Sequence, residues 1–242
     1  MNSLLDKLMR GSEEDTVRAC FARLPVLETE RLLLRRARLQ DAADVFAFSS
    51  DPEVARHVLW QAQTSVGEAR HYIRTLQRQY REGAPSSYVM VLKASGHVIG
   101  TIGFERYVPE TALAEVGYSL ARPLWNQGLA TEALRALLGL CFDRLHLHRV
   151  EAMCDTENPA SARVMEKCGM LREGVLRGRE NNKGQFVDVV MYGMLVSDWN
   201  ARPAAAHCRR EAAPSGAAAP SAGPQSSRKS PAAPPSADTA HG

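Results

Sequence analysis

A polar turn at residues 125–131 is the part of this chain whose residue types and spacing point most directly to chemistry. An extended segment at 115–121 leads into it, and a strand that turns sharply into a helix presents unpaired backbone N–H groups at the positive end of the helix dipole. Because Gly128 has no Cβ, an anion can approach the backbone closely there. The turn is therefore either a phosphate-binding nest, which needs no lysine, or an ordinary strand-to-helix loop. The helical spacing after the turn is carried by Ala130, Ala133, Leu134, Leu137, Leu138 and Cys141.

A second polar segment, residues 155–170, is typical of a capped helix that follows a short strand at 149–154. Asn158 is a suitable N-cap, and Pro159 fits the first helical position. Gly169 is placed to end the helix in a left-handed conformation. The sequence thus contains two strand-turn-helix units in succession.

The two units together resemble motifs A and B of the GNAT acetyltransferases, most closely those of the Rim-type branch, which acetylates the N-termini of ribosomal proteins. The order and spacing fit along roughly residues 28–200. The resemblance implies an α/β GNAT fold with a mixed central sheet of about six to seven strands and flanking helices, splayed between the fourth and fifth strands. It also implies acetyl-CoA as co-substrate and no metal. The matching pieces are Glu-Val-Gly-Tyr-Ser-Leu (115–120), Trp-Asn-Gln-Gly-Leu-Ala-Thr-Glu-Ala (125–133), Asn-Pro-Ala-Ser-Ala-Arg-Val-Met-Glu-Lys-Cys-Gly-Met (158–170) and Met-Tyr-Gly-Met-Leu-Val-Ser-Asp-Trp (191–199).

The resemblance also implies a set of cofactor contacts. The pyrophosphate of acetyl-CoA would lie on the N–H groups of the turn, and the pantetheine arm would pair with the strand backbone near 118–120. The Leu120 N–H would polarise the thioester carbonyl. Asn158 is expected to contact the cofactor as well as to cap its helix, although capping alone would also explain it. The expected cofactor-binding residues are Ser119, Leu120, Asn126, Gln127, Gly128, Leu129, Ala130, Thr131 and Asn158.

Acetyl transfer to an amine also needs a base and a proton for the leaving thiolate. Glu115, on the strand that leads to the turn, is the first choice for the base, and Glu105 is its rival; either could instead be a solvated or ion-paired carboxylate. The tyrosine that many GNAT enzymes carry seven residues after the asparagine is Met165 here. The proton would then come from Tyr118, Ser161 or water, unless Ser161 is only a helix-surface hydroxyl.

The first position of the turn differs from the wider superfamily as well. Trp125 stands where most GNAT sequences have glutamine or arginine. A tryptophan at this position is usual in the Rim-like branch, so it supports the branch assignment.

Composition divides the chain of 242 residues into three parts. We expect an N-terminal extension at 1–27, the acetyltransferase domain at 28–200 and a disordered tail rich in alanine, proline and serine at 201–242. The net charge of +3 lies in the tail, so residues 1–200 are neutral and lack the basic face of a nucleic-acid-binding domain. Five cysteines form no Cys-x-x-Cys pair, and the N-terminus has neither a signal peptide nor a membrane span. These features predict a cytoplasmic protein without disulfides or a zinc site.

Strands and helices alternate in the middle of the chain and are flanked by hairpins, which predicts a mixed α/β sheet. The expected strands are 31–36, 87–93, 97–106, 113–121, 149–154, 171–180 and 186–196, and the expected helices are 39–49, 66–82, 130–145 and 158–168.

The acceptor is less clear than the donor. The groove for it is expected from residues 54–65, with His57 and Trp60, and from residues 177–186. A protein N-terminal α-amine is the first expectation, and an antibiotic, polyamine or amino acid is the alternative. A non-catalytic acyl-CoA-binding module is a third hypothesis. The protein is expected to be a monomer or homodimer without a membrane or specific nucleic-acid partner.

Overall fold

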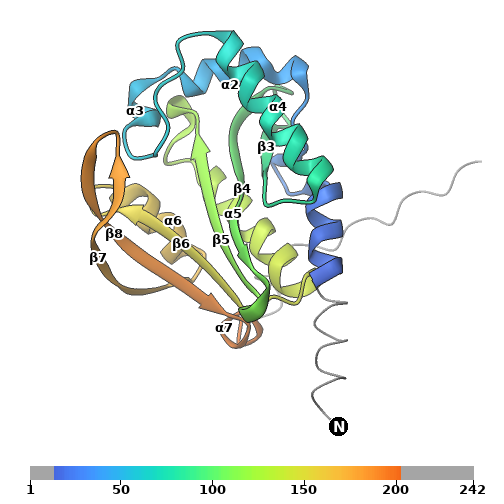
Figure 1. Ribbon diagram of the computed structural model, residues 1–242, viewed down its shortest axis with the longest axis vertical. Coiled ribbons are helices and arrows are strands. Elements are labelled where there is room, and N and C mark those ends of the chain that lie inside the picture. Colours follow the sequence, from blue (N-terminus) through green and yellow to red (C-terminus); the bar gives the residue numbers. More distant parts are fainter. Residues whose placement is uncertain (1–13, 203–242) are drawn as a thin grey trace, which may run out of the picture. The chain divides into compact units, whose positions relative to one another are not determined.

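The computed structural model describes residues 14–202 of the chain, so most of the predicted tail, including Cys208, lies outside the described residues. One eight-stranded mixed sheet runs through this part in the order β1-β2-β3-β4-β5-β6-β8-β7. Figure 1 shows the sheet with helices on both of its faces. The strands are β1 (Leu27–Glu28), β2 (Leu32–Arg35), β3 (Ser87–Leu92), β4 (Val98–Val108), β5 (Leu113–Leu120), β6 (Arg149–Asp155), β7 (Leu171–Asn182) and β8 (Gln185–Leu195).

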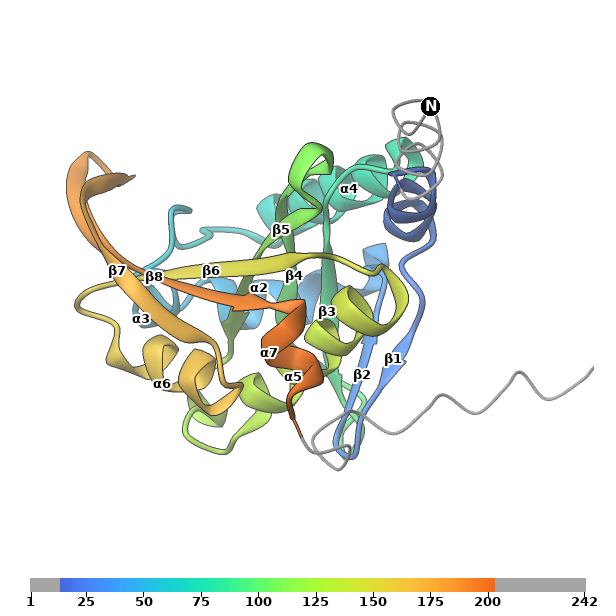
Figure 2. The ribbon, with the colours of Figure 1, turned by 90° about the horizontal axis from the view of Figure 1, so that it is seen from below.

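Helices cover both faces of this sheet. In Figure 2, α4 lies on one side, and α5, α6 and α7 lie on the other. The helix α2 packs against α4. The helices are α2 (Ala42–Ser49), α3 (Pro52–Ala55), α4 (Val66–Glu82), α5 (Leu129–Gly139), α6 (Pro159–Lys167) and α7 (Val196–Asn200); short helical turns are η1 (Leu39–Asp41), η2 (Pro109–Thr111), η3 (Arg122–Leu124) and the π-turn η4 (Leu140–Arg144).

Local sequence explains where α4 and α6 begin and end. The Ser65 side chain accepts a hydrogen bond from the Glu68 N–H at the start of α4, and Gly83 ends that helix at φ +62°. Asn158 caps α6 in the same way through the Ser161 N–H, and Gly169 has φ +72° after its end. The predicted caps of α6 are therefore confirmed.

Two predicted boundaries differ from the structure. The sheet has eight strands rather than six or seven, because a two-residue strand, β1, pairs with β2 through contacts too short to leave a sequence pattern. The helix expected to run to Leu145 ends as an α-helix at Gly139 and continues as the wider turn η4. An apolar face continues through both segments, so periodicity alone does not separate them.

The N-terminal extension contributes to the core where the structure describes it. Residues 14–23 are helical, and Val17, Phe21 and Leu24 are almost fully buried. The Phe21 ring lies 4.9 Å from that of Phe104 on β4. This helix therefore packs on the same core as the sheet.

A single parallel pairing divides the otherwise antiparallel sheet. β5 pairs with β6 only through Leu113–Glu115 against Arg149–Glu151, after which β5 continues for five residues and diverges from β6. The parallel arrangement follows from the crossover through α5, since parallel neighbours need a long connection. The predicted splay between residues 113–121 and 149–154 is thus present, between strands labelled β5 and β6.

Candidate active site

The turn between β5 and α5, residues 121–128, follows directly on the part of β5 that diverges from β6. Gly128 has φ +79° and is the N-cap of α5, and Asn126 has φ +61°. The first backbone hydrogen bond of the helix runs from the Glu132 N–H to the Gly128 carbonyl at 3.0 Å. The N–H groups of Leu129, Ala130 and Thr131 precede this bond, so they are the unpaired helix-start donors that an anion can accept.

Trp125 connects this turn to the end of β5. Its indole N–H donates to the Leu120 carbonyl at 2.7 Å, and the Gln127 side chain donates to the Pro123 carbonyl at 3.1 Å. An arginine or glutamine at position 125 could reach out to a ligand, whereas this tryptophan holds the turn against the strand. The departure from the wider superfamily thus has a structural role here.

The diverging part of β5 has a free backbone edge on the side of β6. The Ala121 N–H donates to Ile99 on β4, and N–H groups alternate between the two edges of a strand. The N–H groups of Leu120 and Tyr118 are therefore directed toward the opening between the strands. This is the edge that a ligand entering the splay meets.

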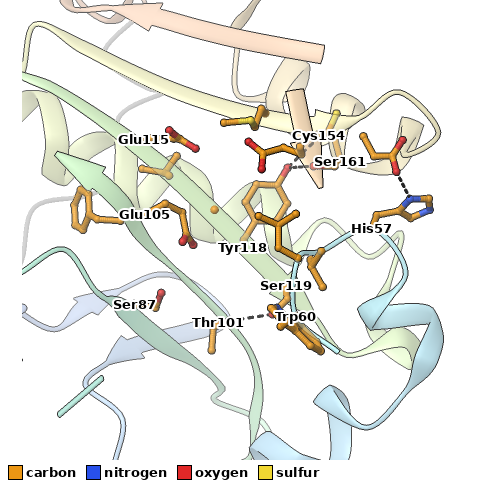
Figure 3. Close-up of a pocket in the computed structure, with 18 of the residues that line it drawn as sticks. His57, Trp60, Ser87, Thr101, Glu105, Glu115, Tyr118, Ser119, Cys154 and Ser161 are labelled. Atoms are coloured by element: carbon orange, nitrogen blue, oxygen red, sulfur yellow. Dashed lines mark hydrogen bonds and ion pairs between the residues drawn. The ribbon is translucent and has the colours of Figure 1, made fainter. Parts of the chain in front are cut away.

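Side chains along β5 alternate between the two faces of the sheet. Tyr118 lies on the side of α6, where its hydroxyl contacts Ser161 Oγ at 2.9 Å and donates to the Ser161 carbonyl at 3.1 Å (Figure 3). Burial raises the pKa of the Tyr118 hydroxyl, which therefore stays protonated. Asn158 Oδ1 accepts from the Ser161 N–H at 3.1 Å. This cap holds Ser161 in place, and the Ser161 hydroxyl in turn contacts that of Tyr118.

Glu115 lies on the opposite face, and it is ion-paired. Arg106 Nε is 3.4 Å from the Glu115 carboxylate, and Arg106 Nη2 is 3.7 Å from that of Glu151. Desolvation raises the pKa of Glu115, although the Arg106 charge opposes the shift. Ser119, on the same face, contacts Thr101 through their hydroxyls at 3.0 Å.

Glu105 lies near Glu115, at the point where the pairing register between β4 and β5 shifts. Phe104 pairs with Val116 and Arg106 with Glu115, which leaves Glu105 as the extra residue of a bulge in β4. Its side chain passes so close over Gly117 that a Cβ added at Gly117 would lie 2.8 Å from Glu105 Oε1. Desolvation, and then the nearby Glu115 charge, raise the pKa of Glu105. Within residues 14–202, no hydrogen bond or ion pair engages this carboxylate.

A cavity of about 500 Å³ lies in the splay and is lined by Glu105, Glu115 and Tyr118, whereas no residue of the turn at 125–131 lines it (Figure 3). Leu59 and Trp60 line it but remain 59% and 36% exposed, so they stand at its mouth. The predicted acceptor segments both contribute to its wall, as do all three predicted catalytic residues, Ser119 and Asn158. The residues that bear on the argument are His57, Trp60, Glu105, Glu115, Tyr118, Ser119, Asn158, Ser161, Glu180 and Asn182.

The wall formed by residues 56–60, here called the lid segment, is held from two sides. His57 Nδ1 is 3.2 Å from Asp155 at the end of β6. From the tip of the β7–β8 hairpin, Lys183 donates to the Ala55 and Val58 carbonyls, and Asn182 donates to the Arg56 carbonyl, at 2.7–3.0 Å. These carbonyls lie at the end of the short helix α3 or just after it, and that of Ala55 also accepts from the Val58 N–H at 3.4 Å.

Residues far away in sequence that support the turn were missed by sequence reasoning. Thr29 and Arg31 bind Glu132 on the first turns of α5, and Arg31 also binds the Gln127 carbonyl. Roughly a hundred residues separate the partners, and no local pattern signals such a contact. The structure finds no cluster of histidine, cysteine or acidic residues suited to a metal, and no helix able to cross a membrane, within its described range.

Comparison with known proteins agrees with this geometry. Residues 31–171 match the model of the acetyltransferase (GNAT) domain. An uncharacterized N-acetyltransferase, p20, from Bacillus licheniformis is 35% identical over 73% of this chain and 99% of its own length. The ribosomal-protein-serine acetyltransferase of Escherichia coli is 32% identical over 41% of this chain and 55% of its own length.

A solved structure shows the same fold. A ribosomal L7/L12 α-N-protein acetyltransferase, determined in complex with coenzyme A, superposes with a TM-score of 0.65 at 22% identity, covering 72% of this chain and 99% of its own. The parallel β5–β6 pair, the turn into α5 and the domain match describe one architecture. The chain therefore belongs to the GNAT family of acetyltransferases, and its relatives include Rim-type enzymes.

Proposed function

We propose that this acetyltransferase moves the acetyl group of acetyl-CoA to the α-amine of a peptide or protein N-terminus, by direct attack in a ternary complex. One observation carries the proposal: the splay between β5 and β6 has on one face the Glu105 carboxylate, without a partner among the described residues, and β5 continues into a turn whose helix-start N–H groups are unpaired. Donor and acceptor can therefore meet in the opening. The cavity mouth, flanked by exposed Leu59 and Trp60, suits an acceptor whose remainder stays outside.

In this proposal the turn holds the donor. The pyrophosphate lies on the N–H groups of residues 127–131, beside Asn126, and the pantetheine arm follows the free edge of β5 past Ser119. The Leu120 N–H, directed into the opening, polarises the thioester carbonyl. Asn158 completes the wall of the cavity at this end. A relative of the same fold that was determined in complex with coenzyme A supports the choice of donor.

The chemistry is proton removal, attack and expulsion of a thiolate. Glu105 takes a proton from the acceptor ammonium, and the neutral nitrogen attacks the thioester carbon to form the C–N bond. The C–S bond then breaks, the thiolate takes a proton from Tyr118, whose hydroxyl is held by Ser161, or from water, and the acetylated nitrogen returns its second proton to that donor. The products are the N-acetyl amide, the free thiol and one proton released to water.

Glu105 and Glu115 have different roles in this scheme. Sequence order favours Glu115 as the base, but its carboxylate is 3.4 Å from Arg106 and so is partly neutralised. Glu105 has no such partner among the described residues and crosses the pocket floor at Gly117. We therefore assign proton removal to Glu105, and we assign to Glu115 the charge that keeps the pKa of Glu105 high.

A substrate panel tests the reaction. Thiol release from acetyl-CoA is measured with peptides that start with serine or alanine, with polyamines, with free amino acids and with aminoglycosides. We expect turnover on the peptides. Turnover confined to small amines would contradict the peptide assignment, and tight acetyl-CoA binding without any turnover would make the protein a binding module.

Substitution of the two carboxylates tests the base. Glu105→Gln should lower kcat by roughly 10²–10³-fold and abolish the acidic limb of the pH–rate profile, while Glu115→Gln should shift that limb toward lower pH. Glu110→Gln, a change on the exposed turn η2, is the matched control and should leave the profile unchanged. If Glu115→Gln removes the limb and Glu105→Gln keeps it, the assignments are reversed.

Substitution of Gly128 tests the turn. Gly128→Val should raise the KM for acetyl-CoA at least tenfold and leave the acceptor KM unchanged, because valine strains the left-handed backbone of the turn and its Cβ would lie 3.5 Å from Arg31 Nη2. Gly96→Val is a control of matched strain, since Gly96 has φ +75° in the β3–β4 hairpin with open space around it. Equal kinetics for the two variants would remove the phosphate assignment.

A further inference from the structure

Arg31, just before β2, makes an unusual set of contacts with the turn. Its Nη1 donates to the Gln127 carbonyl at 2.9 Å, and its Nε donates to the Glu132 carboxylate at 2.7 Å. The Glu132 carboxylate also accepts from the Arg31 N–H at 2.8 Å and from the Thr29 hydroxyl at 2.6 Å. Three donors from residues 29–31 thus bind the Glu132 carboxylate, and the Arg31 side chain positioned in this way also binds the turn at the Gln127 carbonyl.

These contacts fix the orientation of one peptide unit. The Gln127 carbonyl and the Gly128 N–H belong to the same planar trans amide, so they point in opposite directions. A guanidinium bound to the carbonyl therefore directs the Gly128 N–H to the other side of the turn. Without that bond, the peptide between Gln127 and Gly128 could rotate at small cost, because Gly128, at φ +79°, has no Cβ to restrict it.

Glu132 sets the position of the guanidinium in turn. It lies on the first turns of α5, one turn after Gly128, and its own N–H donates to the Gly128 carbonyl at 3.0 Å. Hydrogen bonds from Thr29 and Arg31 outweigh the desolvation of this carboxylate and lower its pKa. Glu132 therefore stays ionised at neutral pH and remains paired with Arg31.

We propose that Arg31, anchored by Glu132, is a positioning residue for acetyl-CoA that orients the Gly128 N–H toward the pyrophosphate. This rests on the proposed cofactor turn and names a residue that the turn sequence does not contain. The pair is partly exposed, with side-chain exposures of 43% for Arg31 and 17% for Glu132. In this proposal the effect of the pair on catalysis falls on cofactor affinity, because the Arg31 guanidinium contacts the turn at the Gln127 carbonyl.

The test is the dissociation constant of coenzyme A, measured by calorimetry, together with steady-state kinetics. Arg31→Gln and Glu132→Gln should each weaken binding by roughly tenfold. Both should raise the KM for acetyl-CoA and leave kcat and the acceptor KM within about twofold. A merely structural role would not produce this division between the two substrates.

A double-mutant cycle adds a second criterion. The Arg31→Gln/Glu132→Gln variant should bind coenzyme A about as well as either single variant, because both changes release the same carbonyl. The affinity of Arg31→Lys for coenzyme A should lie between those of the parent and of Arg31→Gln. An ammonium can bind either the carbonyl or the carboxylate, but it cannot bridge both as the guanidinium does. The lysine variant also keeps a folded protein available if the glutamine variant proves unstable.

Arg35→Gln is the matched control on the adjoining strand β2. It removes a more buried pair, in which two Arg35 nitrogens donate to Asp41 at 2.7 and 2.8 Å, and it lies away from the turn. It should lower the melting temperature without changing the affinity for coenzyme A. An equal loss of affinity in this control would mark the Arg31 effect as general destabilisation and overturn the inference.

The outcomes separate this inference from the proposed function. If Gly128→Val weakens coenzyme A binding and Arg31→Gln and Arg31→Lys do not, the turn is the cofactor site and the inference about Arg31 is wrong. If Gly128→Val and the Arg31 variants all bind coenzyme A normally, the proposed turn itself is wrong.

Discussion

At the residue scale, the proposed site contains two carboxylates, Glu105 and Glu115, whose ionised forms are disfavoured by desolvation. Glu105 crosses Gly117 in a bulge, where desolvation and the Glu115 charge raise its pKa. A base with a raised pKa binds the proton of an ammonium better than an ordinary carboxylate does. The same placement destabilises the folded protein whenever Glu105 is ionised. If Glu105 is the base, as we propose, activity and stability oppose each other at this position.

This opposition predicts the effect of pH on stability. Because the pKa of Glu105 is higher in the folded state than its usual value of 4.5, the folded state binds the proton more tightly, and stability falls as pH rises from 4.5 through the folded pKa. Glu105→Gln removes this loss. Its melting temperature should exceed that of the parent at pH 7 and equal it at pH 4, as measured by thermal denaturation. An advantage of the same size at both values would contradict the mechanism.

At the scale of elements, the acceptor wall depends on contacts between the lid segment and the β7–β8 hairpin. Lys183 and Asn182 donate to three carbonyls at the end of α3 or just after it, and His57 contacts Asp155 at the end of β6. None of these contacts touches the turn into α5. The acceptor side of the cavity can therefore be changed without changing the cofactor side.

The lid segment should consequently control acceptor affinity. Lys183→Met keeps the apolar stem but removes the hydrogen bonds to the Ala55 and Val58 carbonyls, just before and within the lid segment, so the acceptor KM should rise about fivefold to twentyfold. The KM for acetyl-CoA should stay within about twofold of the parent in the same steady-state assay. Gln185→Ala, on the same hairpin, is the control and should change neither constant. A rise in the KM for acetyl-CoA of equal size would show that the hairpin supports the whole site.

At the scale of the molecule, the sheet consists of two parts joined by a short seam. Strands β1–β5 form one part and β6, β8 and β7 the other, and only three residue pairs join β5 to β6. A cofactor in the splay would contact both parts. Its binding energy would therefore add to the stability of the folded state.

This division predicts a thermal shift on binding. At a concentration of acetyl-CoA about 100 times the dissociation constant, linkage contributes about 2.7 kcal/mol. For a domain of this size the melting temperature should rise by roughly 5–10 °C in scanning calorimetry. Gly128→Val should lose most of that shift at the same concentration, whereas Gly96→Val should keep it. A full shift in the Gly128 variant would place the ligand elsewhere.

The sequence alone determined the features that depend on near neighbours. The caps of α6, the left-handed glycine at 169, and the order of strands and helices all rest on interactions within a few residues, so residue type and spacing report them. The resemblance added the family and the splay. Both could be predicted because they depend on the order of motifs along the chain.

Tertiary structure alone decided which side chains share the site. A one-residue bulge in β4 brings Glu105 over Gly117, a pairing with Arg106 engages Glu115, and Arg31 reaches the turn across about a hundred residues. Strand register and long-range contacts are set by the packing of the whole core, and a bulge moves a side chain without leaving a periodic pattern. For that reason the sequence predicted the turn proposed for the donor, and the folded chain identified the groups that contact that turn.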